Sequence, residues 1–157
     1  MKTPLLIPCL LGLAIISAAA AGAEKKLTEQ QVPKPVLEAF HKAFPQAADV
    51  KFEVESKGGK PVYEVEFNDQ GVEREASYSA SGGLLETEEQ IKPEALPAAV
   101  TEAIKKAHPQ ATVVEAEKIL KSDGSLIGFE VEIKDGGKTL EIHLDHTGKI
   151  IKTEVDD

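Results

Sequence analysis

The chain contains the same helical segment twice, and this repeat limits its fold more than any other feature of the sequence. Residues 32–52 read VPKPVLEAFHKAFPQAADVKF, and residues 96–116 read LPAAVTEAIKKAHPQATVVEA. At an offset of 64 residues Pro33 matches Pro97, and the later Pro-Gln-Ala triplets match as well. An internal repeat of this length predicts two copies of one structural unit.

Residues 1–23 have the composition of an export signal. Lys2 gives a positive start, a short apolar run follows, and small residues lead up to Ala23. We expect cleavage between Ala23 and Glu24, because small residues precede that bond. One alternative is an uncleaved membrane anchor, for which the run is short and interrupted by proline and glycine. The other is a lipid-modified Cys9, which would leave almost no segment ahead of it. A cleaved signal predicts a periplasmic or secreted protein.

The acidic composition argues against two classes of partner. Acidic residues number 27 and basic residues 18, which gives a net charge of −9. Such a chain is not expected to bind nucleic acids or anionic membrane surfaces, since both attract basic patches. Solubility is the simpler explanation of the acidity. Cys9 is the only cysteine and falls in the signal, so the mature chain depends on its own apolar core.

Each copy is predicted to begin with a helix of about three turns. In the first copy Pro33 suits the first helical position, and Val36 and Phe40 lie on one apolar stripe. Pro45 disfavours a helical Phe44, so the helix should end there. The second copy repeats this pattern from Pro97 onward.

After each helix the apolar period changes from about four residues to two, as is typical of strands. The first copy predicts strands over residues 50–55, 63–67, 72–79 and 84–88, and the second copy predicts them over 113–120, 129–134, 140–145 and 149–155. Short turns rich in glycine separate them, which indicates antiparallel hairpins. We therefore expect two repeats, residues 24–89 and 90–157, each a helix followed by a four-stranded antiparallel meander. The fold class is α+β.

The second copy also carries a family resemblance. Leu96-Pro97 opening a helix, the sequence KKAHPQA that ends it, and FEVEIKDGGKTLEIHLDHTGKIIK at residues 129–152 resemble the PepSY-like, β-lactamase-inhibitor-like family. The resemblance covers nearly the whole mature chain, once per copy. It implies that the two sheets lie side by side as one curved eight-stranded surface with both helices on one side. It also implies an exported, non-catalytic module that binds proteins, in some cases as an inhibitor or pro-region, without a cofactor.

Acidic side chains dominate the sheet face that is predicted to point away from the helices. They are Glu53, Glu55, Glu64, Glu66, Glu73, Glu75, Glu115, Glu117, Glu130, Glu132 and Glu141, with His143 among them. The functional interpretation is a docking surface for a basic partner, which would be another envelope or secreted protein such as a hydrolase that the chain inhibits or modulates. The other interpretation is a charged surface that discourages aggregation of the sheet. The alternative function is an envelope module that binds or senses divalent cations.

The aromatic residues are all predicted to lie on the opposite, inward face. Tight protein interfaces depend on Trp, Tyr and Arg anchors, and the acidic face offers no aromatic one. The family's inhibitor role is therefore not expected to transfer as high-affinity inhibition, and a weaker contact steered by charge fits better.

No arrangement typical of catalysis occurs in the sequence. The serines lack a G-x-S-x-G context, and carboxylates on an open sheet are expected to be solvated and to keep ordinary pKa values. His143 beside Glu130 or Glu132 could hold a divalent metal weakly, but no metal-ligand spacing fixes such a site. We therefore predict that the chain is not an enzyme and has neither catalytic residues nor a dedicated metal site.

Overall fold

One antiparallel sheet of nine strands runs through the chain, whose computed structural model describes residues 24–156. The strands are β1 (Lys25–Leu27), β2 (Ala48–Lys57), β3 (Lys60–Asp69), β4 (Val72–Ser79), β5 (Leu84–Gln90), β6 (Thr112–Lys121), β7 (Leu126–Asp135), β8 (Lys138–Asp145) and β9 (Ile150–Asp156). Each pairs with the next along the chain. The predicted signal, and the Ala23 side of its cleavage site, fall outside the described residues. Among residues 24–156 no helix is long and apolar enough to cross a membrane.

Two helices of ten residues each precede β2 and β6. They are α1 (Lys34–Ala43) and α2 (Ala98–Ala107), and a single turn of 3₁₀ helix leads into each, at Glu29–Gln31 and Pro93–Ala95. Pro33 and Pro97 are the N-cap residues, one position earlier than predicted, and their carbonyls accept the first helical hydrogen bonds. Phe44 leaves the helical region at φ −127°, as expected for a residue before proline.

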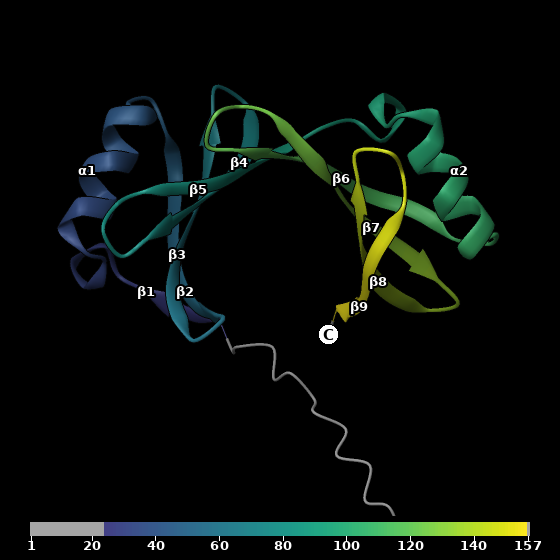
Figure 1. Cartoon of the computed structure of the whole chain (residues 1–157), viewed down its shortest axis with the longest axis horizontal. Coiled ribbons are helices and arrows are strands. Elements are labelled where there is room, and N and C mark those ends of the chain that lie inside the picture. Colours follow the sequence, from purple (N-terminus) through teal and green to yellow (C-terminus); the bar gives the residue numbers. More distant parts are fainter. Residues whose placement is uncertain (1–23, 157) are drawn as a thin grey trace, which may run out of the picture.

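Both helices pack on the same face of the sheet. The core of the first repeat gathers Val36 and Phe40 of α1 against β2 to β4, and the second core gathers Val100 and Ile104 of α2 against β6 to β8. The strand register joins the two cores through one row of cross-strand partners. That row is Phe67, Arg74, Glu89, Lys118 and Phe129. Figure 1 shows α1 and α2 on the outer side of an arch formed by the sheet.

The predicted α+β fold of repeated helix and meander units is confirmed, with nine strands in place of eight. The additional strand is β1, a short and mostly polar segment for which the sequence predicted no strand. Lys25 pairs with Val54, and at the offset of 64 residues Glu89 of β5 pairs with Lys118 in the same way. The end of β5 thus pairs with β6, the first strand after α2, in the way that β1 pairs with β2, the first strand after α1. The predicted repeat boundary, between Glu89 and Gln90, stays a prediction and falls within β5.

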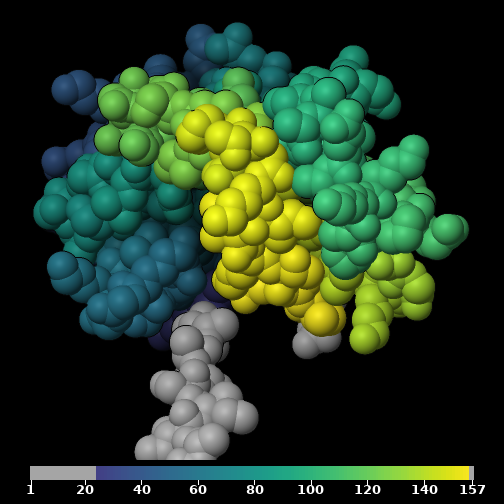
Figure 2. Space-filling model, turned by 45° about the vertical axis from the view of Figure 1, so that its right-hand side comes forward, coloured from purple at the N-terminus to yellow at the C-terminus, as the bar shows by residue number. Residues whose placement is uncertain are grey.

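The sheet bends so strongly that its two edges approach each other across the concave side. Figure 1 shows β1 and β2 at one foot of the arch and β8 and β9 at the other. Charges interact weakly across the gap. Hydrogen bonds to Glu64 and Lys57 lower the pKa of Glu55 of β2, and Lys152 of β9 adds a smaller effect. The hydrogen bond to His143 lowers the pKa of Glu141 of β8, and Lys57 of β2 adds a smaller effect. In the space-filling view the C-terminal strands, in yellow, stand beside the blue strands of the first repeat with a hollow between them (Figure 2). The face opposite the helices is therefore the wall of a groove.

Candidate functional site

The concave side of the sheet encloses a cavity of about 400 Å³ that carboxylates line. Eight of the twelve residues predicted for the acidic face contribute to it: Glu66, Glu73, Glu75, Glu115, Glu117, Glu130, Glu132 and Glu141. We call the concave side, with this cavity at its centre, the carboxylate groove. Its lining comes from both repeats, so neither helix-and-meander unit forms the cavity alone.

The four other predicted residues lie on the same face outside the cavity. Glu53, Glu55 and Glu64 form the β2–β3 side of the groove, where Glu53 and Glu64 are direct register partners. His143 of β8 is the register partner of Glu130 on the β7–β8 side. The structure therefore brings the twelve predicted residues onto one concave face. Whether this face binds a partner remains a prediction.

Sequence analysis missed the contribution of β5, the middle strand of the sheet. Glu88 is the register partner of Glu75, and its side chain lies within reach of Glu117 and Glu130. Glu86 lies closer to the start of β5 and faces Lys57. Their spacing of two residues matches that of the other acidic strands, so this signal was present in the sequence. The adjacent Leu84 and Leu85 and the run of glutamates after Thr87 obscured the alternation.

Curvature changes the acidity of the groove, so the expectation of solvated carboxylates with ordinary pKa values is wrong. Burial, followed by the charge of Glu64, raises the pKa of Glu75 to about 8. Burial also raises the pKa of Glu88 far above its ordinary value of 4.5, and the neighbouring charge of Glu130 adds to the effect. A flat sheet would leave these side chains in water. The arch holds them among other carboxylates and partly removes the water that would solvate their charge.

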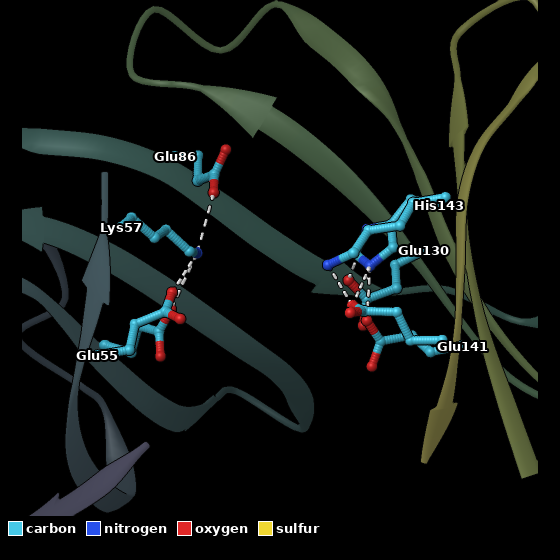
Figure 3. Close-up of polar contacts among 9 residues, drawn as sticks. Glu55, Lys57, Glu86, Glu130, Glu141 and His143 are labelled. Carbon is cyan, nitrogen blue, oxygen red and sulfur yellow. Dashed lines mark hydrogen bonds and ion pairs between the residues drawn. The ribbon is translucent and has the colours of Figure 1, made fainter. Parts of the chain in front are cut away.

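Lys57 is a cation built into the first-repeat side of the groove. Its Nζ lies 2.5 Å from Glu55, 3.2 Å from Glu64 and 4.0 Å from Glu86. Glu64 is only 7% exposed, and burial together with the hydrogen bond to Glu55 raises its pKa to about 7. Burial works against the charge of Lys57, but its hydrogen bond to Glu55 and the charge of Glu64 raise its pKa overall. Figure 3 shows the lysine side chain reaching in between Glu55 and Glu86.

His143 is the corresponding basic side chain on the second-repeat side. Its Nε2 donates a hydrogen bond of 2.6 Å to Glu141, and its Nδ1 lies 3.4 Å from Glu130. The hydrogen bond to Glu141 raises the pKa of His143 against the opposing effect of burial. Figure 3 shows the imidazole and both carboxylates facing the concavity, opposite Lys57. His146, three residues on, lies in the following turn rather than on this face.

A second ion network lies on the convex face, where the two repeats meet. Arg74 contacts Glu89 at 2.5 Å and Asp69 at 3.3 Å, and Lys118 contacts Glu89 from the other side at 2.6 Å. All three contacts join neighbouring strands between the two apolar cores. These charged side chains occupy the place between the two apolar cores and link the strands where the repeats meet.

The aromatic side chains lie where the sequence predicted them. All seven belong to, or pack against, the cores beneath the helices: Phe40, Phe44, Phe52, Tyr63, Phe67, Tyr78 and Phe129. Phe67 alone also borders the cavity. The groove can therefore hold a ligand by charge and hydrogen bonding and offers little aromatic surface for stacking.

Comparison with known proteins identifies the relatives of this chain. Residues 61–152 match the family described as beta-lactamase-inhibitor-like, PepSY-like. This chain belongs to that family. Residues 33–77 also match the peptidase propeptide and YPEB domain family, abbreviated PepSY. The resemblance predicted from the sequence is thus confirmed, and the two matches together span residues 33–152. A search of curated proteins finds no significant match.

Solved structures with the same PepSY-like fold come from Bacteroides species. A protein provisionally assigned to the periplasm of Bacteroides eggerthii superposes with a TM-score of 0.64 at 15% identity, covering 79% of this chain and 88% of its own. A DUF2874 family protein from Bacteroides uniformis gives 0.62 at 18% identity, with 78% and 88% covered. A BLIP-like protein from Bacteroides fragilis gives 0.54 at 22% identity, with 77% and 84% covered. At these identities the likeness establishes the fold.

Proposed function

We propose that this PepSY-like chain is an exported, non-catalytic binding protein whose carboxylate groove receives a basic segment of another envelope or secreted protein. The observation that carries the proposal is the convergence of glutamates from both repeats on one concave cavity. Like charges on neighbouring strands, such as Glu66 beside Glu75 and Glu117 beside Glu130, cost folding free energy. A cationic partner would relieve that cost, so charge complementarity favours a basic ligand.

Lys57 illustrates how a partner's lysine would be received. Its ammonium lies within 3.2 Å of both Glu55 and Glu64, although its side chain comes from the end of a strand in the same chain. A partner lysine could make similar charge-assisted hydrogen bonds to the cavity carboxylates. We therefore propose lysine and arginine side chains in an extended segment as the ligand chemistry.

The absence of aromatic anchors from the predicted acidic face sets the expected strength of the contact. The aromatic side chains pack in the cores on the other face, so a partner is held mainly by charge. Charge-dominated contacts form quickly and weaken as salt increases. We propose a reversible, salt-sensitive complex rather than tight inhibition.

The family supports an exported hydrolase as the class of partner. The descriptions of both matching families refer to a hydrolase. One family is beta-lactamase-inhibitor-like, and the other is a peptidase propeptide domain. One structural neighbour is provisionally assigned to the periplasm, which agrees with the export signal predicted for residues 1–23. We propose that the chain acts in the periplasm or outside the cell and modulates such an enzyme.

A binding assay with matched charge variants tests the proposal. The ligand is a fluorescently labelled lysine-rich peptide, and the protein is residues 24–157. The groove variant carries Glu66→Lys and Glu132→Lys. These two residues are equivalent in the two repeats, and both line the cavity. The helix variant carries Glu38→Lys and Glu102→Lys. It makes the same change in net charge at exposed positions of α1 and α2. Fluorescence anisotropy at low and high salt measures the affinity of each protein.

We expect the groove variant to bind the peptide at least about tenfold more weakly than the wild type at low salt. The helix variant should retain most of the affinity, because its changed charges lie on the opposite side of the sheet. Equal losses in the two variants would show that net charge alone attracts the peptide, and the docking role of the groove would then be wrong.

A further inference from the structure

The two repeats place different basic side chains beside equivalent carboxylates. At the offset of 66 residues that relates the later strands, Glu64 corresponds to Glu130 and Ser77 corresponds to His143. In the first repeat the ammonium of Lys57 lies 3.2 Å from Glu64. In the second repeat Glu130 faces the imidazole of His143, 3.4 Å away. A basic side chain therefore lies beside this glutamate in both copies, and in the second copy it is an imidazole, which can also ligate a metal.

The imidazole is not required by the architecture of the sheet. Ser77 occupies the equivalent strand position in the first repeat, so a small neutral side chain is compatible with the fold there. His143 is also surrounded by carboxylate oxygens on more than one side. Its Nε2 lies 2.6 Å from Glu141 and 4.0 Å from Glu154 of β9, while its Nδ1 faces Glu130.

We propose that Glu130, Glu141 and His143 form a binding site for a divalent transition metal, with zinc as the best match. One donor atom from each residue, a ring nitrogen and two carboxylate oxygens, lies within 4.8 Å of the other two. A tetrahedral zinc with ligands at about 2.0–2.2 Å requires donors roughly 3.3 Å apart, so small side-chain rotations would complete the geometry. Glu154 or water can supply a fourth ligand.

The ligand set favours zinc over calcium or magnesium. Calcium and magnesium take oxygen ligands almost exclusively, whereas an imidazole nitrogen suits zinc and its neighbours in the first transition series. The ligands also come from adjacent strands, since Glu130 and His143 are register partners and Glu141 is two residues away on β8. Paired strands hold the donors more firmly than loops would.

This site does not depend on the proposed docking function. The docking proposal concerns the charge of the whole groove, whereas the metal proposal concerns three side chains on its second-repeat side, two of which, Glu130 and Glu141, also line the cavity. Zinc binding and peptide binding can therefore each be present without the other, and the two assays report on them separately.

The test is metal titration of untagged protein, residues 24–157, by isothermal titration calorimetry with zinc, calcium and magnesium chlorides. The same proteins are followed by NMR of the histidine rings. His143→Gln removes the nitrogen ligand, and Glu141→Gln removes a carboxylate but keeps its shape. His146→Gln is the matched control, because it removes a histidine three residues away that lies in the turn.

We expect one zinc per chain, bound more tightly than calcium or magnesium, with zinc shifting the ring signals of His143 ahead of those of the three other histidines. His143→Gln and Glu141→Gln should each weaken zinc binding by about tenfold or more, and His146→Gln should leave it unchanged. Zinc binding no tighter than millimolar would overturn the proposal. So would zinc binding that survives His143→Gln in a folded protein, or calcium bound as tightly as zinc, because either result would indicate pooled carboxylates without the imidazole.

Discussion

Glu75 shows how strongly its surroundings alter a side chain that the sequence places on an open sheet. Its register partners are Glu66 on β3 and Glu88 on β5, so carboxylates flank it on both sides. Its pKa is raised from the ordinary 4.5 to about 8, first by burial and then by the charge of Glu64. The folded protein therefore binds this proton more tightly than the unfolded chain. Ionisation of Glu75 destabilises the fold progressively as the pH rises from 4.5 to 8.

Replacing Glu75 by Gln should remove this pH-dependent loss. At pH 3.5 and below, the variant and the wild type should differ little in unfolding free energy, because the wild-type carboxyl is then mostly protonated in both the folded and the unfolded states. At pH 8.5 the variant should be more stable by on the order of 1–2 kcal/mol, after allowance for partial solvent exposure. Urea unfolding at both pH values measures this difference. Glu38→Gln, on the exposed surface of α1, is the control, and a Glu75→Gln variant that gains no more than the control would contradict the assignment.

At the scale of the element, the turn between β8 and β9 requires a glycine at position 148, because the turn packs closely against α2. Gly148 has φ +88°, and a Cβ there would lie 2.7 Å from the carbonyl carbon of Ala99 at the start of α2. The equivalent Gly82 has φ +82° and approaches Pro35 of α1 in the same way. Each glycine lets a hairpin turn pack directly against the first turn of its helix. Sequence alone indicated a turn at these positions, but not that the turn touches the helix.

Gly148→Ala should therefore destabilise the protein more than an alanine at a comparable turn glycine. Gly124 also has a positive φ, +81°, but a Cβ there would meet nothing within 4 Å. We expect Gly124→Ala to cost about 1 kcal/mol from backbone strain alone. Gly148→Ala should cost about 2–4 kcal/mol, because the steric clash adds to the strain. Chemical unfolding of both variants gives the comparison, and equal losses would mean that the turn can move away from α2 at little cost.

At the scale of the whole molecule, the sequence predicted which residues share a face but not how far the sheet bends. Alternation placed Phe67 toward the helix and Glu64 and Glu66 away from it, and the structure agrees. The acidic face was therefore predictable. Curvature accumulates over nine strands from twist and bulges, such as the register shift at Ile119, and periodicity does not encode its extent. For this reason the groove and its raised pKa values could not be predicted.

The pH dependence of binding follows from the same curvature. Glu64 and Glu75 have pKa values raised to about 7 and about 8, so both gain negative charge as the pH rises from 5.5 to 8.5. The lysine-rich peptide stays positively charged over this range. We therefore expect it to bind several-fold more tightly at pH 8.5 than at pH 5.5, at constant ionic strength. Anisotropy titrations of the wild type and of a Glu64→Gln, Glu75→Gln double variant measure the effect. A similar pH dependence in both proteins would assign it to other groups.

The most direct test of the docking role is an NMR footprint of the lysine-rich peptide on ¹⁵N-labelled protein, residues 24–157. The groove account predicts that backbone signals of β3 to β8 beside the concave glutamates shift on titration. Signals from the exposed surfaces of α1 and α2 should stay in place, and added salt should reverse the shifts. Shifts concentrated on the helices, or spread evenly over the acidic surface, would contradict a ligand site between the two repeats.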